Sequence, residues 1–204
     1  MIRRSVMAAG VALAVLIPET TAIAQAKEGI VVHGHWTLEV RNVDGSAGER
    51  REFENALVPD GVKTLAQILT RQRSVGSWIV MVRSVSNPGM FGCSNAAILG
   101  EPGPLVPTPC AFPDLSVSLD PSLTKVVLRG TVKATLAGDI TSVGTRVSAP
   151  CVAGAIDCVS PPVTFDFTST AVKDANLVTK PLHLEKDQSV LVTVTLSFTS
   201  PAGS

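Results

Sequence analysis

The stretch GHWTLEVRNVDGSAGERREFEN, residues Gly34–Asn55, predicts the first folded unit of this chain. Its opening residues alternate apolar and polar side chains, which indicates a β-strand with one buried face. The pair Asp44-Gly45 follows, and such pairs tolerate the positive φ of a two-residue hairpin turn. A charged segment then returns as a second strand. We therefore expect a β-hairpin, and most of the downstream sequence also reads as strands that need such a partner.

Two registers are compatible with this hairpin. With a two-residue turn, Trp36 faces Phe53 and Glu39 faces Arg50, and each pair stabilises the hairpin by roughly 0.2–1 kcal/mol. A three-residue turn instead pairs Glu39 with Arg51 and moves Phe53 to the polar face. We favour the first register, although it leaves Glu49 and Arg51, the neighbours of Arg50, on the apolar face. That arrangement suits an edge strand whose outer half lies in water.

Residues 1–26 have the pattern of a signal peptide. Arg3 and Arg4 precede the apolar run Val6–Ile17, which is shorter than the roughly 20 residues that span a bilayer. Small residues occupy the two positions that signal peptidase reads before Lys27, so we expect cleavage there; the alternative is an uncleaved anchor. The mature chain is then a single domain, and its predicted location is periplasmic or secreted.

The predicted mature domain, residues 27–204, has 178 residues, which is long enough for one hydrophobic core. Removing Arg3, Arg4 and Glu19 from the 17 basic and 17 acidic residues leaves 15 and 16. This near-neutral balance does not favour nucleic acid or an anionic membrane as a partner. No second long apolar run occurs, so we expect no transmembrane anchor in the mature chain.

Four cysteines follow the predicted cleavage site, an even number that favours disulfides in an exported protein. Three connectivities are possible. We favour Cys93–Cys110 and Cys151–Cys158, because each pair brackets a loop rich in Pro or Gly. Closing such loops stabilises a fold by about 2–3 kcal/mol each in the chain-entropy model. A zinc site is the alternative, but the spacings do not match paired zinc knuckles.

One helix is expected in the mature chain, over about Val62–Gln72. Pro59-Asp60-Gly61 opens it, with Asp60 as the cap, and Arg71 and Arg73 lie near the negative end of the helix dipole. Helical spacing predicts that one apolar side faces the protein. Its members are Val62, Leu65, Ile68 and Leu69.

The remaining patterns are those of strands. Trp78–Val82 is apolar on both faces, as in a central covered strand, and Val190–Phe198 has the clearest alternation. Leu123–Leu136 is a long alternating segment in which Gly130 marks a bend, and Gly138-Asp139 is expected to turn the chain. About eight strands with one short helix predict an all-β antiparallel β-sandwich. A β-barrel is the alternative.

Candidate chemistry is sparse. His33 and His35 lie on one side of a strand, and His183 is the only other histidine, so the three are weak candidates for a zinc or copper site. No catalytic pair of carboxylates, nucleophile motif, phosphate loop or calcium loop is evident. We therefore predict no catalytic residues and no cofactor. Trp36 and Trp78 belong to apolar faces and are expected in the core.

The segments GHWTLEVRN-DG-ERREFENAL and VTVTLSF resemble a family of uncharacterised β-rich exported bacterial proteins, some of them similar to phage-tail-associated domains. The resemblance covers the hairpin, the helix and the last strand, and it implies no catalytic residues. The alternating last strand in an exported, disulfide-stapled fold is also similar to pilin-type sandwiches.

Two functions follow as hypotheses. The first is an exported non-enzymatic β-sandwich that acts in surface contact or assembly, with an unknown protein or surface partner and with self-assembly possible. Its predicted contact surface is the pair of stapled loops, Asn87–Pro113 and Pro150–Pro162. The alternative is a small exported metal-binding or hydrolytic domain that uses His33 and His35.

Overall fold

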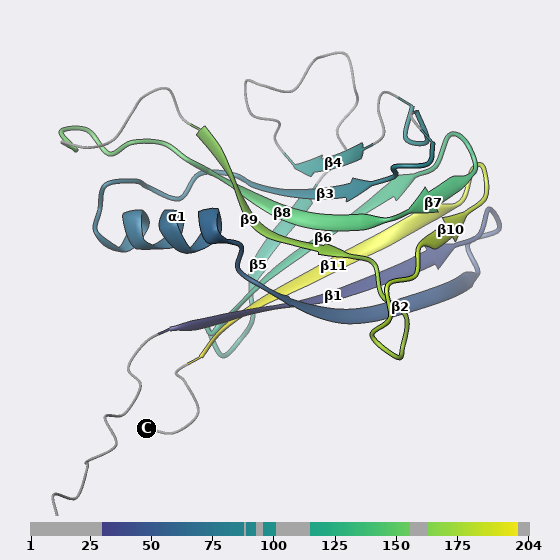
Figure 1. Ribbon diagram of the computed structural model, residues 1–204, viewed down its shortest axis with the longest axis horizontal. Coiled ribbons are helices and arrows are strands. Elements are labelled where there is room, and N and C mark those ends of the chain that lie inside the picture. The colour runs from purple at the N-terminus through teal and green to yellow at the C-terminus, as the bar shows by residue number, and fades with distance from the viewer. Residues whose placement is uncertain (1–29, 88, 93–95, 101–114, 156–162, 200–204) are drawn as a thin grey trace, which may run out of the picture.

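The computed structural model describes residues 30–87, 89–92, 96–100, 115–155 and 163–199 (Figure 1). Within these ranges the chain forms eleven strands and one helix, where the sequence predicted about eight strands. All strand pairs are antiparallel, and none of the described sheets closes into a barrel. The predicted all-β sandwich with one short helix is therefore confirmed, and the barrel alternative is wrong.

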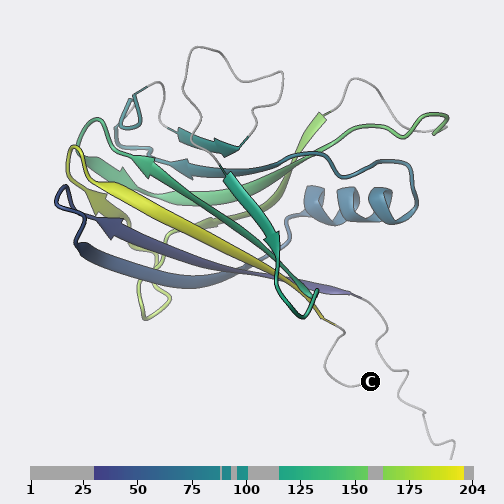
Figure 2. The same ribbon diagram turned by 180° about the vertical axis from the view of Figure 1, so that it is seen from behind.

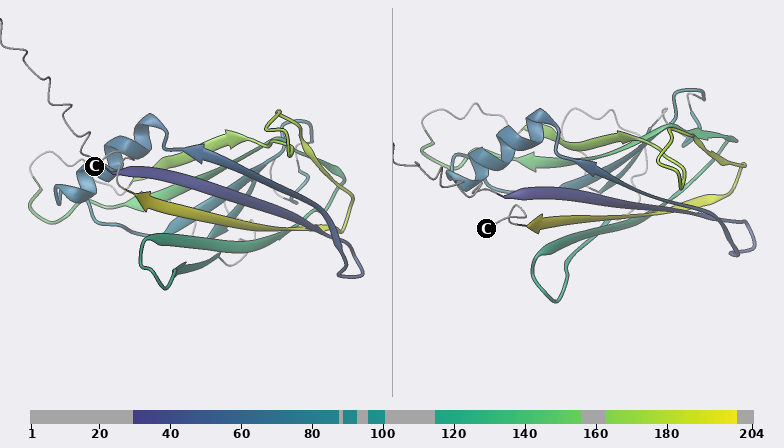
Figure 3. Two further views of the ribbon diagram at one scale, coloured as in Figure 1. Left: turned by 90° about the horizontal axis from the view of Figure 1, so that it is seen from below. Right: turned by 60° about the horizontal axis from the view of Figure 1, so that its bottom comes forward.

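The larger sheet has five strands in the order β2-β1-β11-β6-β5. Figure 2 shows its outer face, and Figure 3 shows it from below. β11 lies in its middle, as the strong alternation of the last strand predicts for a strand with one buried face. The strands are β1 (Val31–Arg41), β2 (Ala47–Ala56), β11 (Ser189–Thr199), β6 (Lys125–Lys133) and β5 (Leu115–Leu119).

The β1–β2 hairpin has the favoured register. Trp36 lies opposite Phe53, with their rings stacked at a centroid distance of 6.4 Å, and Glu39 lies opposite Arg50. The turn differs from the prediction. The Asn42 carbonyl accepts a hydrogen bond from Gly45 N at 2.9 Å. Within the turn, Gly45 is the one residue with a positive φ, which is 83°. The two-residue turn was therefore wrong, and a bulge between β1 and β2 restores the register beyond it.

The smaller sheet has four strands in the order β4-β3-β8-β9. The apolar strand β3 lies inside it, between β4 and β8, and Ile79–Val82 is buried throughout, as predicted. A bulge next to Thr145 shifts the pairing of β8 with β9. The strands are β3 (Trp78–Arg83), β4 (Ala96–Gly100), β8 (Ser142–Ala149) and β9 (Val163–Ala171).

The core lies between the two sheets. Trp36 is fully buried, as expected, while Trp78 is half-buried and meets the Phe167 ring edge-on at 5.2 Å. On the other side of the larger sheet, hydroxyl and charged side chains face outward. The fully or almost fully buried apolar residues of β11 are Val190, Val192, Val194 and Leu196.

The sheets join at one corner, where the chain leaves β2. Leu57 forms an isolated bridge with Thr168 of β9, and Val58 N donates to the Phe167 carbonyl at 3.1 Å. The helix α1 (Pro59–Leu69) starts directly after this corner and packs against β9 (Figure 1). Pro59 occupies its first turn, and Val58 caps it without a side-chain hydrogen bond, so the predicted Asp60 cap was wrong.

The helix buries the predicted side only in part: Leu65 packs against the core and Ile68 is half-buried. Val62 and Leu69 are 55% and 62% exposed, while Gly61 and Thr64 are buried. A Cβ atom on Gly61 would lie 2.4 Å from the Phe167 carbonyl oxygen, so the glycine lets α1 approach β9 closely. This contact sets the rotation of the helix. Arg73 extends from the region beyond the helix to the Ala149 carbonyl at 2.6 Å.

The segment after β6 also departs from expectation. Gly138-Asp139 does not turn the chain but belongs to the short strand β7 (Gly138–Ile140), which pairs with β10 (Leu182–Leu184) in a separate two-stranded sheet. Leu136, on the apolar side of the alternating segment Leu123–Leu136, is 48% exposed. No helix in the described ranges is both long and apolar enough to cross a membrane.

Candidate functional site

The predicted histidine trio is not assembled. His33 and His35 are exposed on the outer face of β1, opposite Ala56 and Glu54 of β2. His183 lies on β10, in the two-stranded sheet with β7. Among the described residues, no group of three His, Cys, Asp or Glu side chains is placed to hold a metal ion.

His183 instead belongs to a surface ion-pair cluster. Its Nδ1 lies 2.8 Å from an Asp139 carboxylate oxygen, and its Nε2 lies 3.5 Å from Glu185. The hydrogen bond to Asp139 raises the pKa of His183 above its ordinary value, and the charges of both carboxylates raise it further, while desolvation opposes the shift. The imidazole is more than half exposed, so this cluster is a solvated charge group.

The predicted cross-links fall mostly beyond the described residues. Cys93, Cys110 and Cys158 lie outside them. Cys151 lies at the end of β8, where its backbone bridges to Arg73, and it is disulfide-bonded. Both pairings stay predictions. Most of the two predicted contact loops also lies outside the described part of the chain.

The described residues do form a hollowed surface, and it lies along β2. β2 is an outermost strand of the five-stranded sheet, and among the described residues only Leu57, just beyond its end, pairs with another strand on that side. The turn that follows β9, residues 173–178, faces this open edge (Figure 3). The edge-strand prediction for the returning hairpin strand is therefore confirmed.

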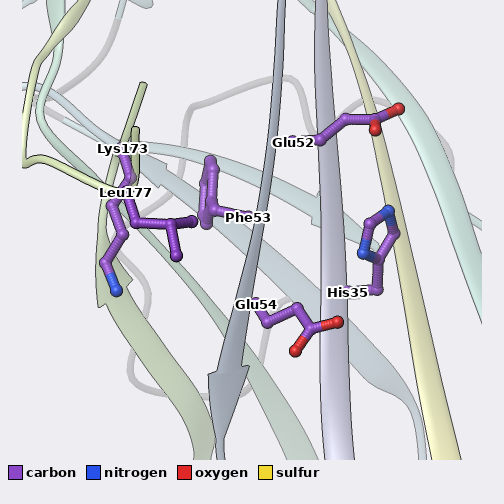
Figure 4. A pocket seen from close by; sticks show the side chains of 6 residues that line it. All are labelled: His35, Glu52, Phe53, Glu54, Lys173 and Leu177. Atoms are coloured by element: carbon purple, nitrogen blue, oxygen red, sulfur yellow. The ribbon is translucent and has the colours of Figure 1, made fainter. Parts of the chain in front are cut away.

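Two hollows separate the β2 edge from this turn. One, of about 520 Å³, is lined by Arg50, Arg51, Glu52 and Ala175. The other, of about 500 Å³, is lined by His35, Glu52, Phe53, Glu54, Lys173 and Leu177 (Figure 4). Both hollows are open to solvent, so the edge can be reached from outside. We call this combined region the β2 groove.

The turn that faces β2 is held by one aspartate. The Asp174 carboxylate accepts hydrogen bonds from Asn176 N at 2.9 Å and from Val178 N at 3.2 Å. Leu177 has a positive φ of 60° and is 63% exposed, so a strained turn displays an apolar side chain at the groove. Apolar side chains shown to solvent in this way are available for contact.

The two sides of β2 carry opposite charges in the groove. Figure 4 shows Lys173 and Leu177 on the side to which Phe53 points, and His35, Glu52 and Glu54 on the other side. Arg51 shares the inner side with Phe53, because side chains two residues apart in a strand point the same way. We name these the inner and the outer side of the β2 edge.

Arg51 is the most unusual residue of the groove. Its side chain is only 5% exposed, although the charged neighbours of Arg50 were expected to lie partly in water. Its Nε and Nη2 lie 2.7 and 2.5 Å from one oxygen of the half-exposed Glu49. Its Nη1 is buried and has no hydrogen-bond partner in the described structure. The expectation that Arg51 lies partly in water was therefore wrong, although β2 is an edge strand. Ala175 of the turn after β9 lines the hollow beside Arg51.

Near Arg51, in the same hairpin, other buried polar atoms also lack hydrogen-bond partners. Trp36 Nε1 and both amide atoms of Asn55 have none among the described residues. Gly34, paired with Asn55, lies beneath the Asn55 side chain, since an added Cβ would come within 2.1 Å of its Oδ1. These atoms belong to the same hairpin as Arg51. Sequence patterns do not reveal them, because burial of a polar atom depends on contacts between distant segments.

Comparison with known proteins adds no relatives: no family model, no curated protein and no solved structure matches this chain.

Proposed function

We propose that this protein is an exported, non-enzymatic β-sandwich that acts by surface contact, and that the contact surface is the β2 groove. The observation that carries the proposal is the open edge of β2, reached through two hollows of about 520 and 500 Å³. The occupant is a strand-like segment of another polypeptide. This surface replaces the two stapled loops as the contact site, because the groove has a defined geometry.

An open edge supports such binding by simple backbone chemistry. Along an outer strand, alternate N–H and C=O groups point away from the sheet and lack partners. An extended segment satisfies them by adding a strand, while its alternate side chains enter pockets on both sides. The facing turn supplies the second wall, with Ala175 and Leu177 at its surface.

Export is part of the proposal. A signal peptide over residues 1–26, disulfides Cys93–Cys110 and Cys151–Cys158, and a periplasmic or secreted location form one consistent set, since disulfides persist in oxidising compartments. The bonded state of Cys151 supports it. Sequencing of the secreted protein from Lys27 and peptide mapping without reductant test these points. Retention of Met1 would contradict cleavage, and free thiols would contradict the cross-links.

The functional test is an unbiased selection of peptides. We expect a displayed library of random heptapeptides to yield ligands of the purified protein. Ala175→Trp, which fills one hollow, should weaken their binding at least tenfold in calorimetry. Asn176→Trp, on the same turn but outside both linings, is the matched control and should bind like the wild type. No enriched peptide, or equal binding by both variants, would contradict the proposal.

A further inference from the structure

The charges around the β2 groove are distributed so that they specify what enters it. The inner side carries Lys173 and Arg51, with Arg51 paired to Glu49, and the outer side carries Glu54 and Glu52, with Glu52 paired to Arg50. Within the described structure, Lys173 and Glu54 take part in no ion pair, so both charges are available to a partner. The inner side therefore has a net positive charge and the outer side a net negative charge.

A strand added beside β2 meets these two sides with alternate residues. Directly opposite residues of neighbouring strands lie on the same side of the sheet, about 4.5–5.5 Å apart at Cβ. The residue that pairs with Phe53 thus points inward, and its two neighbours point outward beside Glu52 and Glu54. The residue beside Arg51 points inward again. Each position of the added strand has its own preferred chemistry.

Arg51 fixes the strongest of these preferences. A guanidinium has five N–H donors, and Glu49 occupies only its Nε and Nη2. A buried donor without a partner, as at Nη1, lowers stability by about 1–3 kcal/mol. An acidic side chain from the added strand supplies both the missing acceptor and a second negative charge.

We propose that the β2 groove selects an extended peptide with an acidic residue beside Arg51, an apolar residue beside Phe53 and basic residues beside Glu52 and Glu54. This inference rests on the proposed function and adds the chemistry of its ligand. The order acidic-basic-apolar-basic-acidic satisfies it in both strand directions, because that order reads the same from either end.

A second copy of β2 is a poorer occupant. In a two-fold antiparallel pairing, the strand is centred on one residue that faces itself. Centring on Arg50, Arg51 or Glu52 sets one charged residue against itself but also forms two Arg–Glu pairs. Centring on Phe53 or Glu54 forms only like-charge contacts. Like charges directly opposite destabilise a sheet pair. No self-pairing register gives Arg51 an acidic neighbour and both Glu52 and Glu54 basic neighbours at once, so the full order favours a different chain.

Two peptides of identical composition test the inference. The first, acetyl-Thr-Glu-Lys-Val-Lys-Glu-Thr-amide, has the proposed order. The second, acetyl-Thr-Lys-Glu-Val-Glu-Lys-Thr-amide, exchanges the acidic and basic positions. We expect calorimetry on the purified full chain to show at least tenfold tighter binding of the first, with a preference that shrinks at high salt. Equal affinities, or tighter binding of the second, would overturn the charge rule.

A protein variant supplies the reciprocal test. Glu52→Lys combined with Glu54→Lys alters two exposed side chains and should weaken the first peptide about tenfold, since two favourable contacts become repulsive. Glu185→Lys, outside the groove and 70% exposed, is the control and should change nothing. Thermal melting shows whether both variants fold. An unchanged affinity of the folded double variant would overturn the inference.

The outcomes separate the inference from the proposed function. Library peptides that bind in the groove without this charge order would overturn the inference alone. Failure of both designed and selected peptides would overturn both proposals. A dimer in analytical ultracentrifugation that Glu52→Lys with Glu54→Lys abolishes would overturn the inference in favour of a second copy.

Discussion

The five-stranded sheet has two edges, and they are protected in different ways. β2, at one edge, has ten residues, five of them charged, and it faces a turn across two hollows. β5, at the other edge, has five residues, LSVSL, with no charge, and Val117 and Leu119 are 49% and 60% exposed. Natural sheets limit unwanted edge pairing either by charges or by very short strands. In this sheet β2 carries the charges, and β5 is the short strand.

The difference shows which edge suits selective recognition. A short uncharged edge offers few backbone groups and no side-chain rule for its partner. A long charged edge rejects most partners through repulsion and accepts one with the complementary order, which is how specificity arises from unfavourable contacts. The charges of β2 therefore serve both to prevent aggregation and to choose a ligand.

The largest expected effect on stability is at β11, the central strand of the five-stranded sheet. Val194 of β11 is fully buried between Trp36 and Leu128, and Thr195 faces outward between His35 and Val127. Val194→Asp should lower the free energy of unfolding by several kcal/mol, about 4 or more, because it buries an unpaired carboxylate.

Its matched control is Thr195→Asp, on the outer face of the same strand, which should lower stability by less than about 1 kcal/mol. Urea denaturation measures both values. Similar losses of stability in the two variants would mean that the sheet has no single buried face, and the comparison of its edges would lose its basis.

The next prediction compares the stability cost of truncating an inward side chain at each edge. Phe53 of β2 is 2% exposed and stacks on Trp36, whereas Val117 of β5 is half-exposed. Phe53→Ala should cost about 3 kcal/mol of stability and Val117→Ala less than about 1 kcal/mol. Chemical denaturation of both variants checks this difference. Equal costs would contradict the difference in side-chain burial between the two edges.

The smallest effect lies away from both edges, at His183. Its pKa is raised in the folded protein, so it stabilises the fold fully below the ordinary histidine pKa, and this contribution is lost as the pH rises through the folded pKa. The melting temperature of the wild type should therefore fall slightly, relative to His183→Gln, as the pH rises across that range. Parallel pH profiles for the two proteins would contradict this assignment.

The sequence predicted the hairpin register and the last strand because both rest on strict alternation and complementary neighbours. It placed the inward face of α1 only partly right, because Gly61, which allows the close approach to β9, carries no hydrophobic signal. It missed β7 because Gly-Asp-Ile reads as a turn until its partner β10 is known. Local patterns thus specified the long strands, and long-range contacts decided the rest.

The candidate site was only half predictable. The charge density of β2 identified it as an edge strand, which the sheet order confirms. The burial of Arg51 was not predictable, because the turn that lies beside it across a hollow comes more than 120 residues later in the chain. That turn contains three apolar and three polar residues and has no periodic pattern. Its position depends on how β9 packs over the sheet.

Hydrogen exchange of backbone amides in the full-length protein, with and without a bound groove peptide, tests the central claim most directly. A strand added at the β2 edge forms new hydrogen bonds with the outward N–H groups of that strand. The account predicts slower exchange within residues 49–55 at saturating peptide, with β5 unchanged. Slower exchange in β5, or no change in β2 while the peptide is bound, would contradict it.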